Sequence, residues 1–450
     1  MSLVRGGTSS SPASLFAASE PGVWYDPSDL TTLFQDDAGA TPVTTPGQTV
    51  GRILDKSGRS NHATQATESQ KPIYGINPIV GTRNIYTYTE QFDNAYWGKS
   101  AGPVTVAADV IVAPDGTTTA DKVQETANTS PFFAINANPS PVLFSSSYTW
   151  SGYFKAAERS FISVNFSALG VMFLFNLTTG ASRVSTGTAT LTSTDVGNGW
   201  WRCTATFTTP ASGINLLYHV IGPALSLITL VTTGTDGYGF YIWGAQLEQS
   251  ATTTAYQKVV SQYEVTEAGV KSVGYLAFVQ GIDDNMVTPT ITPGIDKVQV
   301  FAGVRKLSDA AVGLVAEFST NSSSAGSMAL FAPSGVYSNY MFRSKGTVSS
   351  DNTSPFTFAA LITNVITGLA DISGDSNVLR INASQVNQNL TDQGTGNYLA
   401  YPLYIGRRGS DSTLPFNGRL YSLIVRFGAN LTTGQITSTE SWVNSKTGAY

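Results

Sequence analysis

Carboxylates are the residues of this chain best suited to chemistry, because glycoside hydrolysis needs two of them held across one sugar linkage. A Glu-x-Asp-x-Glu spacing would place three carboxylates on one face of a strand, and the sequence does not contain it. Asp283 and Asp284 are adjacent, but neighbouring side chains in a turn point apart, and Asp commonly serves turns. We interpret this pair as a turn that holds the backbone.

The histidines and the single cysteine offer little for nucleophilic catalysis. His62 lies in a Gly- and Asn-rich turn and His219 in a strand-like run, so we expect both to be structural. Cys203 is expected to be a small buried hydrophobe, and as the only cysteine it forms no internal disulfide. No nucleophile elbow, phosphate loop or His/Cys cluster occurs. We therefore expect no enzyme, although carboxylates from distant strands can still converge.

Calcium is the one cofactor that the acidic residues suggest, since carboxylate and carbonyl oxygens suit this hard ion. The candidate ligands are Asp371 and Asp375, in the loop of residues 371–377, and Asp115, which precedes Gly116. Ordinary turns are the favoured interpretation of both loops.

Aromatic side chains are the candidates for sugar recognition, because an exposed aromatic face stacks on the apolar side of a pyranose ring. Most of the seven tryptophans and twenty tyrosines should be core. Adjacent Trp200 and Trp201 face opposite sides of a strand, so one of them can reach solvent. The candidate glycan-binding residues are Tyr96, Trp97, Trp201, Tyr337 and Tyr340.

Alternating apolar residues predict the strands that must carry these side chains. Residues 161–166, 298–304 and 421–427 alternate with a period of two, and residues 171–175 are apolar on both faces. Runs of this kind build antiparallel sheets that stack face to face.

One clear helix is predicted near the C-terminus. Thr432 or Thr433 can cap its start and Gly448 its end. The residues expected to face the sandwich are Ile436, Thr439 and Val443, with Trp442 at the edge.

The composition of the 450 residues fits sandwiches with polar, uncharged surfaces, because only 12% are charged. Net charge is −5 and the basic residues are scattered, which argues against nucleic acid. The richest apolar stretch, residues 216–231, is interrupted by His219, Gly222 and Pro223, so no membrane insertion is expected.

The N-terminal segment is expected to be an anchoring arm, residues 1–20, that includes Arg5. Residues 1–15 are small and polar and should be disordered alone, so an ordered arm needs a neighbouring subunit to lie against. The segment has no apolar signal core. With no disulfides either, a protein made in a cytoplasm and released by lysis is indicated, as in virus particles.

Two sets of motifs resemble known families. The first set comprises residues 24–30, 34–36, 41–43 and 50–65, then 275–284, 404–407, 416–425 and the terminal helix. It resembles the laminin-G/concanavalin-A-like domains of bacteriophage virion proteins. The second set lies between its two parts and comprises residues 84–97, 113–122, 148–156, 199–202 and 239–248. It is similar to phage-borne domains akin to carbohydrate-binding modules.

The resemblances imply an all-β fold of two antiparallel β-sandwich (jelly-roll) domains, one inserted in the other, with a short C-terminal helix. The interrupted domain comprises residues 21–83 and 258–450, and the insert comprises residues 84–257. The crossings, residues 71–83 and 258–271, should run side by side, because an insertion needs both ends close together.

The resemblances also imply a structural or adhesive protein of a tailed-phage-like particle, in a tail fibre, baseplate or head spike. Expected partners are other virion subunits, through the arm, and a host cell-surface glycan. A symmetric homo-oligomer is expected, with a trimer as the first choice. The expected location is the virion, assembled in the host cytoplasm. Two alternatives stay open: a decorating scaffold without ligand, and a polysaccharide depolymerase.

Overall fold

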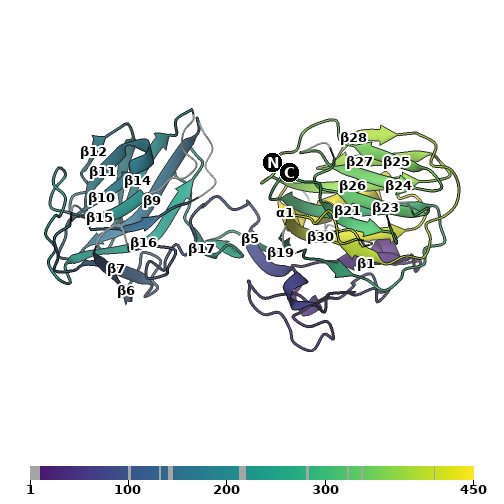
Figure 1. The fold of residues 1–450 in the computed structure, drawn as a ribbon, viewed down its shortest axis with the longest axis horizontal. Coiled ribbons are helices and arrows are strands. Elements are labelled where there is room, and N and C mark those ends of the chain that lie inside the picture. The colour runs from purple at the N-terminus through teal and green to yellow at the C-terminus, as the bar shows by residue number, and fades with distance from the viewer. Residues whose placement is uncertain are drawn as a thin grey trace, which may run out of the picture. The chain divides into compact units, whose positions relative to one another are not determined.

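The chain forms two compact units in the computed structural model (Figure 1). The structure describes all residues except 1–10, 100–102, 131–132, 140–144, 212–218, 280–282, 322–323, 336–337 and 410. The host unit comprises Met1–Gly81 and Lys271–Tyr450, and the inserted unit comprises Thr82–Val270. In Figure 1 purple and yellow strands share the host unit, whereas the inserted unit is mostly teal.

The host unit is a sandwich of two antiparallel sheets. The first host sheet has the order β5 (Ile73–Pro78), β19 (Ser272–Phe278), β30 (Gly418–Phe427), β21 (Lys297–Lys306), β26 (Thr363–Asp371), β27 (Ser376–Ile381) and β28 (Ser384–Asn389), and β1 (Gly22–Tyr25) also pairs with β30. The second has the order β2 (Leu33–Phe34), β3 (Arg52–Ile53), β4 (Ala63–Thr64), β20 (Met286–Val287), β29 (Leu403–Ile405), β22 (Leu314–Phe318), β23 (Ser327–Phe331), β24 (Met341–Lys345) and β25 (Ser349–Thr353). Strands from both sides of the insert therefore share each sheet.

The host core lies between these sheets, and the alternation of β21 shows why. Val298 and Val300 point into the core, while Phe301 faces the opposite side. A bulge in β30 changes the expected pattern, because Gly303 pairs with Ser422 and Val304 with Leu420. The bulge directs Leu420 into the core in place of Tyr421, which packs instead on Tyr275.

Short helices complete the host unit: η1 (Pro12–Phe16), η2 (Leu30–Thr32), η3 (Glu68–Gln70) and α1 (Thr433–Thr447). The predicted helix is α1. Thr432 caps its start in a capping box with Gln435, and Gly448 ends it at a φ of 59°. Trp442 and Val443 pack on the outer face of the first host sheet. No helix in the described part of the chain is long and apolar enough to cross a membrane.

The segment from Ser11 to Glu20 packs on its own chain, which corrects the expectation that it lies against a neighbouring subunit. Leu15 and Phe16 are buried against Trp442 and its neighbours. Arg426 donates to the Leu15 carbonyl at 2.7 Å and pairs with Glu20 at 2.8 Å. Residues 1–10, which include Arg5, lie outside the described residues.

The inserted unit is a second sandwich. Its larger sheet has the order β13 (Thr190–Gly197), β14 (Trp200–Thr208), β9 (Ser147–Ala156), β16 (Gly239–Glu248), β7 (Ala120–Glu125) and β6 (Val104–Ile111). Its smaller sheet has the order β12 (Ser182–Thr186), β11 (Val171–Asn176), β10 (Phe161–Phe166), β15 (His219–Ala224) and β8 (Ile135–Ala137). A hairpin of β17 (Gln257–Ser261) and β18 (Glu264–Glu267) and the short helix η4 (Ser167–Leu169) complete it. Ile162, Val164 and Phe166 fill its core as their alternation predicts. The predicted all-β fold class is confirmed.

The entry and exit of the insert lie side by side on the host unit. Pro78 pairs with Ser272, and Ile79 N donates to Lys271 O at 2.9 Å. The second division between the compact units lies after Val270, and the β17–β18 hairpin is bonded to the start of the insert. Val259 N donates to Thr89 Oγ1 at 3.0 Å, for example.

Candidate functional site

The structure separates the aromatic residues proposed from the sequence to bind glycan. Trp97 and Tyr340 are fully buried, so neither offers a ring face to a sugar, which corrects the prediction for both. Tyr96 packs on Trp97, while half-buried Trp201 lies apart on β14 and partly packs on the core. Tyr340 belongs to the host unit, and Tyr337 lies outside the described residues. Alternation along a strand does not reveal which loops cover an aromatic ring.

The acidic residues considered for calcium serve turns and ion pairs. Asp371 accepts from Gly374 N at 2.9 Å and pairs with Lys297 at 3.1 Å. Asp375 accepts from Gln393 N at 3.0 Å, and Asp115 accepts from Thr117 N at 2.9 Å. Within the described ranges no three His, Cys, Asp or Glu side chains converge to hold a metal ion.

The other reactive side chains have structural roles. His62 Nδ1 accepts from Asp55 N at 3.0 Å, and His219 bonds to the Tyr86 hydroxyl at 2.9 Å. Burial raises the pKa of the Cys203 thiol far above its ordinary value, which keeps the thiol protonated. The acidic pair has divergent partners: Asp283 pairs with Arg407, and Asp284 accepts from Val279 N at 2.9 Å.

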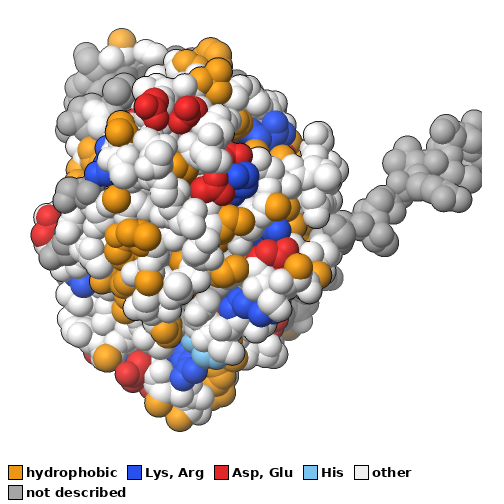
Figure 2. Space-filling view, turned by 90° about the vertical axis from the view of Figure 1, so that its right-hand side faces the viewer, with side chains coloured by type: hydrophobic (Ala, Val, Ile, Leu, Met, Phe, Trp, Pro, Cys, Tyr) orange, Lys and Arg blue, Asp and Glu red, His pale blue; other side chains and the backbone are white. Residues whose placement is uncertain are grey.

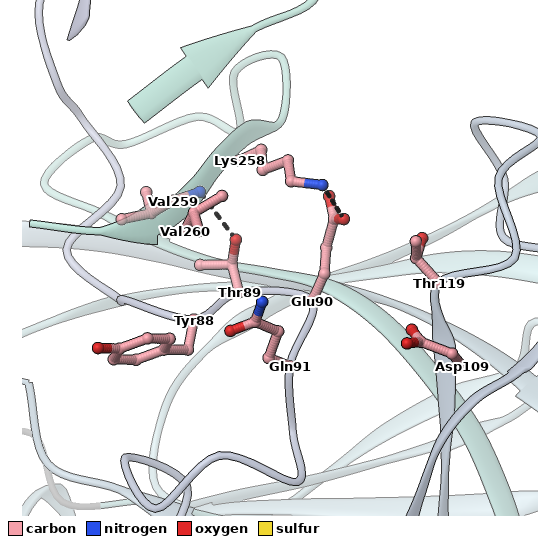
Figure 3. Close-up of a pocket in the computed structure, with 9 residues that line it drawn as sticks. All are labelled: Tyr88, Thr89, Glu90, Gln91, Asp109, Thr119, Lys258, Val259 and Val260. Atoms are coloured by element: carbon pink, nitrogen blue, oxygen red, sulfur yellow. Dashed lines mark hydrogen bonds and ion pairs between the residues drawn. The ribbon is translucent and has the colours of Figure 1, made fainter. Parts of the chain in front are cut away.

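Two adjoining cavities in the inserted unit form a better candidate site. The first lobe, about 140 Å³, is lined by Tyr88, Thr89, Glu90, Gln91, Asp109, Thr119, Lys258, Val259 and Val260 (Figure 3). The second lobe, about 280 Å³, is lined by Glu90, Asp115, Trp243, Tyr256, Lys258, Thr266, Glu267 and Ala268. Glu90 and Lys258 line both lobes, so we treat the two as one pocket, the Glu90–Lys258 pocket.

A directed chain of hydrogen bonds runs through the wall of this pocket. Val259 N donates to Thr89 Oγ1, whose hydroxyl lies 2.7 Å from the Tyr256 hydroxyl. Burial raises the pKa of Tyr256 well above its ordinary value, and the Glu90 carboxylate raises it further, so the phenol remains protonated. It donates to Glu90 Oε1 at 3.1 Å. Lys258 Nζ donates to Glu90 Oε2 at 2.6 Å, and Figure 3 shows these two groups pointing toward each other.

Aromatic rings stand beside this polar chain on the outer face of the larger inserted sheet. The Tyr256 ring lies 4.8 Å from the Trp243 ring and 6.1 Å from the Tyr153 ring. Trp243 Nε1 donates to Thr119 Oγ1 at 3.0 Å, which ties the second lobe to the first. Trp243 is buried, whereas Tyr256 is half-buried, so of these two rings Tyr256 is the one accessible to a ligand.

Asp121 fixes two segments of the first lobe from behind. Its carboxylate accepts from Phe92 N at 2.7 Å and from Asp109 N at 2.9 Å. It therefore links the segment of Glu90 and Gln91 to the strand that carries Asp109. Burial raises the pKa of Asp121 to about 6.

The sequence offered little to indicate this pocket. Glu90 and Lys258 are 168 residues apart, so no local spacing joins them. Tyr256 lies in a polar run with no alternating pattern, and the strand pattern around Trp243 predicts a core residue.

The chain is similar in structure to several solved proteins, but only weakly. No protein-family model and no curated protein matches the sequence. A heptameric SAP-like pentraxin from Limulus polyphemus matches at 14% identity and a TM-score of 0.29, over 36% of this chain and 78% of that one. The CBM40 domain of a Ruminococcus gnavus IT-sialidase, bound to α2,3-sialyllactose, matches at 12% identity and 0.27, over 33% and 84%. The receptor-binding domain of botulinum neurotoxin mosaic serotype C/D matches at 11% and 0.29, over 37% and 42%. The fold assignment rests on the strand topology itself.

Proposed function

We propose that this protein is a glycan-binding adhesion protein and that the Glu90–Lys258 pocket is its sugar site. Sugar recognition needs an apolar ring face next to hydroxyl, amide or charged groups that orient the ligand. The second lobe offers the half-buried Tyr256 ring beside Glu90 and Lys258. The first lobe adds the Gln91 amide and the Thr119 hydroxyl.

The observation that carries this proposal is the double role of Tyr256. Its ring borders the second lobe, while its hydroxyl belongs to the chain that ends on Glu90. Because the phenol and Lys258 both donate to Glu90, the carboxylate is held in one orientation with its charge partly compensated. A preorganised carboxylate can accept sugar hydroxyls without a large ordering cost.

We propose that the pocket works on the outside of a virion. Resemblance of the sequence to phage virion proteins supports an outward-facing virion component. In a symmetric oligomer, weak sugar contacts repeat across copies and give avidity. We propose binding without hydrolysis, because Tyr256 and Lys258 each donate to one oxygen of Glu90 and so engage both of them.

A glycan array tests this function. The wild-type protein should bind a set of glycans, and Glu90→Gln should weaken that binding about tenfold or more, since a hydrogen bond to a charged group is worth about 1.5–3 kcal/mol. Glu264→Gln is the matched control, because Glu264 lies in the β17–β18 hairpin that also carries Lys258 but lines neither lobe.

The alternatives give different outcomes. A scaffold without ligand would bind no glycan on the array. A depolymerase would release new reducing ends from host polysaccharide. Either result would contradict the proposal, as would glycan binding that Glu90→Gln leaves unchanged.

A further inference from the structure

The Glu90–Lys258 pocket carries more acidic than basic groups. Its lining includes the carboxylates of Glu90, Asp109, Asp115 and Glu267, whereas Lys258 is its one lining cation among the described residues. Charge on the lining selects among ligands of similar shape, because like charges brought together cost affinity.

The cations near the pocket are already engaged. Lys258 Nζ lies 2.6 Å from Glu90. Arg83, which lies behind the second lobe, pairs with Glu267 at 2.8 Å, and Gln257 Nε2 donates to the same Glu267 oxygen at 2.8 Å. An incoming anionic sugar would have to displace one of these buried or half-buried partners, and it would leave a carboxylate uncompensated.

The other two carboxylates are available to a ligand. Asp109 and Asp115 are both exposed, and in the described ranges no Lys, Arg or His nitrogen lies within 4.0 Å of either carboxylate. Asp115 Oδ1 is occupied by Thr117, through its N–H at 2.9 Å and its hydroxyl at 2.7 Å, which orients the group.

Asp109 is held in a defined position. Its backbone has a φ of 54°, a left-handed conformation that Asp tolerates better than most residues. Its N–H is fixed by the Asp121 carboxylate at 2.9 Å. The first lobe therefore presents a negative group from a restrained backbone, as a specificity determinant requires.

We propose that the Glu90–Lys258 pocket binds glycans without negative charge and prefers sugars with a free, protonated amino group over their N-acetylated counterparts. This inference rests on the proposed function. A protonated amine can pair with Asp109 or Asp115, the two carboxylates without a cation. A uronate or sialyl carboxylate would meet these same groups and find every nearby cation occupied.

A class-resolved glycan array, followed by titration, tests the preference on the full-length protein. The array should give hits among neutral and amino glycans and none among uronate or sialylated ones. For a matched pair, an oligomer of glucosamine and its N-acetylated form, we expect the free amine to bind about 3- to 10-fold more tightly at low salt. This advantage should vanish in about 1 M salt, where the Debye length is about 3 Å.

Two variants locate the preference. The double variant Asp109→Asn/Asp115→Asn should remove the amine advantage, so that the free-amine and N-acetylated oligomers bind with equal affinity. Asp236→Asn, at an exposed carboxylate of the same unit that lines neither lobe, should leave the advantage intact.

The outcomes separate this inference from the proposed function. Acidic glycans that bind and lose affinity in Glu90→Gln would overturn the charge preference and leave the sugar site standing. Equal binding of the free-amine and N-acetylated forms would also overturn the charge preference without contradicting the sugar site. Binding of no glycan, or binding unchanged by Glu90→Gln, would overturn both.

Discussion

Buried carboxylates in this protein differ in whether a cation accompanies them. Glu440 in α1 is fully buried and receives two guanidinium nitrogens of Arg380, at 2.8 and 3.0 Å. Asp284 is 3% exposed. In the described part of the chain its carboxylate accepts one hydrogen bond, from the backbone N–H of Val279. The guanidinium of Arg380 compensates the buried charge of Glu440, whereas a single N–H offsets little of the desolvation free energy of an ionised Asp284.

Asp284 predicts how stability depends on pH. Burial raises its pKa from 3.8 to about 6, so the native state holds the proton more tightly than the unfolded chain. Its contribution is most favourable below about pH 4 and is lost as the pH rises through about 6. Asp284→Asn keeps an acceptor for Val279 N and should stabilise the protein at pH 7.5 by about 1–2 kcal/mol, after allowance for solvent screening.

Denaturant unfolding at pH 4 and at pH 7.5 checks this prediction. The variant should gain over wild type at the higher pH and gain little at the lower one. Equal differences at both values would show that Asp284 does not titrate in this range. Asp236→Asn, at an exposed site, is the control that should follow wild type at both pH values.

At this scale the sequence identified residue types better than residue environments. Structural roles for His62, Cys203 and the Asp283–Asp284 turn follow from local context, because turns and strand interiors are local features. Exposure of aromatic residues is not local. Trp97 is covered by its chain neighbours Tyr86 and Phe92 and by His219 from the distant strand β15, a contact that no spacing in the sequence encodes.

Among the elements, α1 was the most completely predictable. Its start and end depend on side chains within a few residues, so Thr432 and Gly448 mark both ends in the sequence. The alternating patterns predicted where strands occur and which of their side chains face the core. The exception is Tyr421, which the β30 bulge moves out of register. A bulge is set by the partner strand, so the alternation of β30 alone could not reveal it.

The capping box gives a prediction for this element. Thr432→Ala removes the side chain that accepts from Gln435 N, and it should destabilise the host unit by about 1 kcal/mol. Thr433→Ala is the matched control, since the neighbouring exposed side chain is not the cap and Ala has the higher helix propensity. Thermal unfolding of both variants checks the prediction, and equal shifts in Tm would contradict it.

On the scale of the whole molecule, the insert occupies a position where a simple hairpin could stand. β5 and β19 are antiparallel neighbours, and Ile79 N bonds to Lys271 O where the insert leaves and returns. The host sheets have their own core, which contains Val300, Phe318 and Leu423 and, among the described residues, includes none from the insert. The two-part pattern of motifs in the sequence predicts an interrupted domain of this kind.

Deleting the insert tests the independence of the host unit. We expect a chain in which Asn-Gly replaces residues 80–270 to fold, since it then joins the bonded residues Ile79 and Lys271 by a two-residue turn of the type that connects antiparallel strands. It should show β-sheet circular dichroism and a single cooperative thermal transition. Loss of that transition would mean that the host unit needs its insert. Residues 82–270 expressed alone should fold as well and should retain the glycan binding proposed for the full chain.

The pairing of β5 with β19 also sets an order of events on the ribosome. At about 5–20 residues per second, the roughly 190 residues of the insert take about 10–40 s to emerge. During that interval β1 and β5 have left the exit tunnel, but their partners β30 and β19 have not yet been translated. The backbone N–H and C=O groups of these nascent host strands therefore stay unpaired until the inserted unit has been synthesised. Rapid folding of the inserted unit would bring the end of β5 close to the start of β19. The shorter effective loop would favour pairing of the two strands over aggregation.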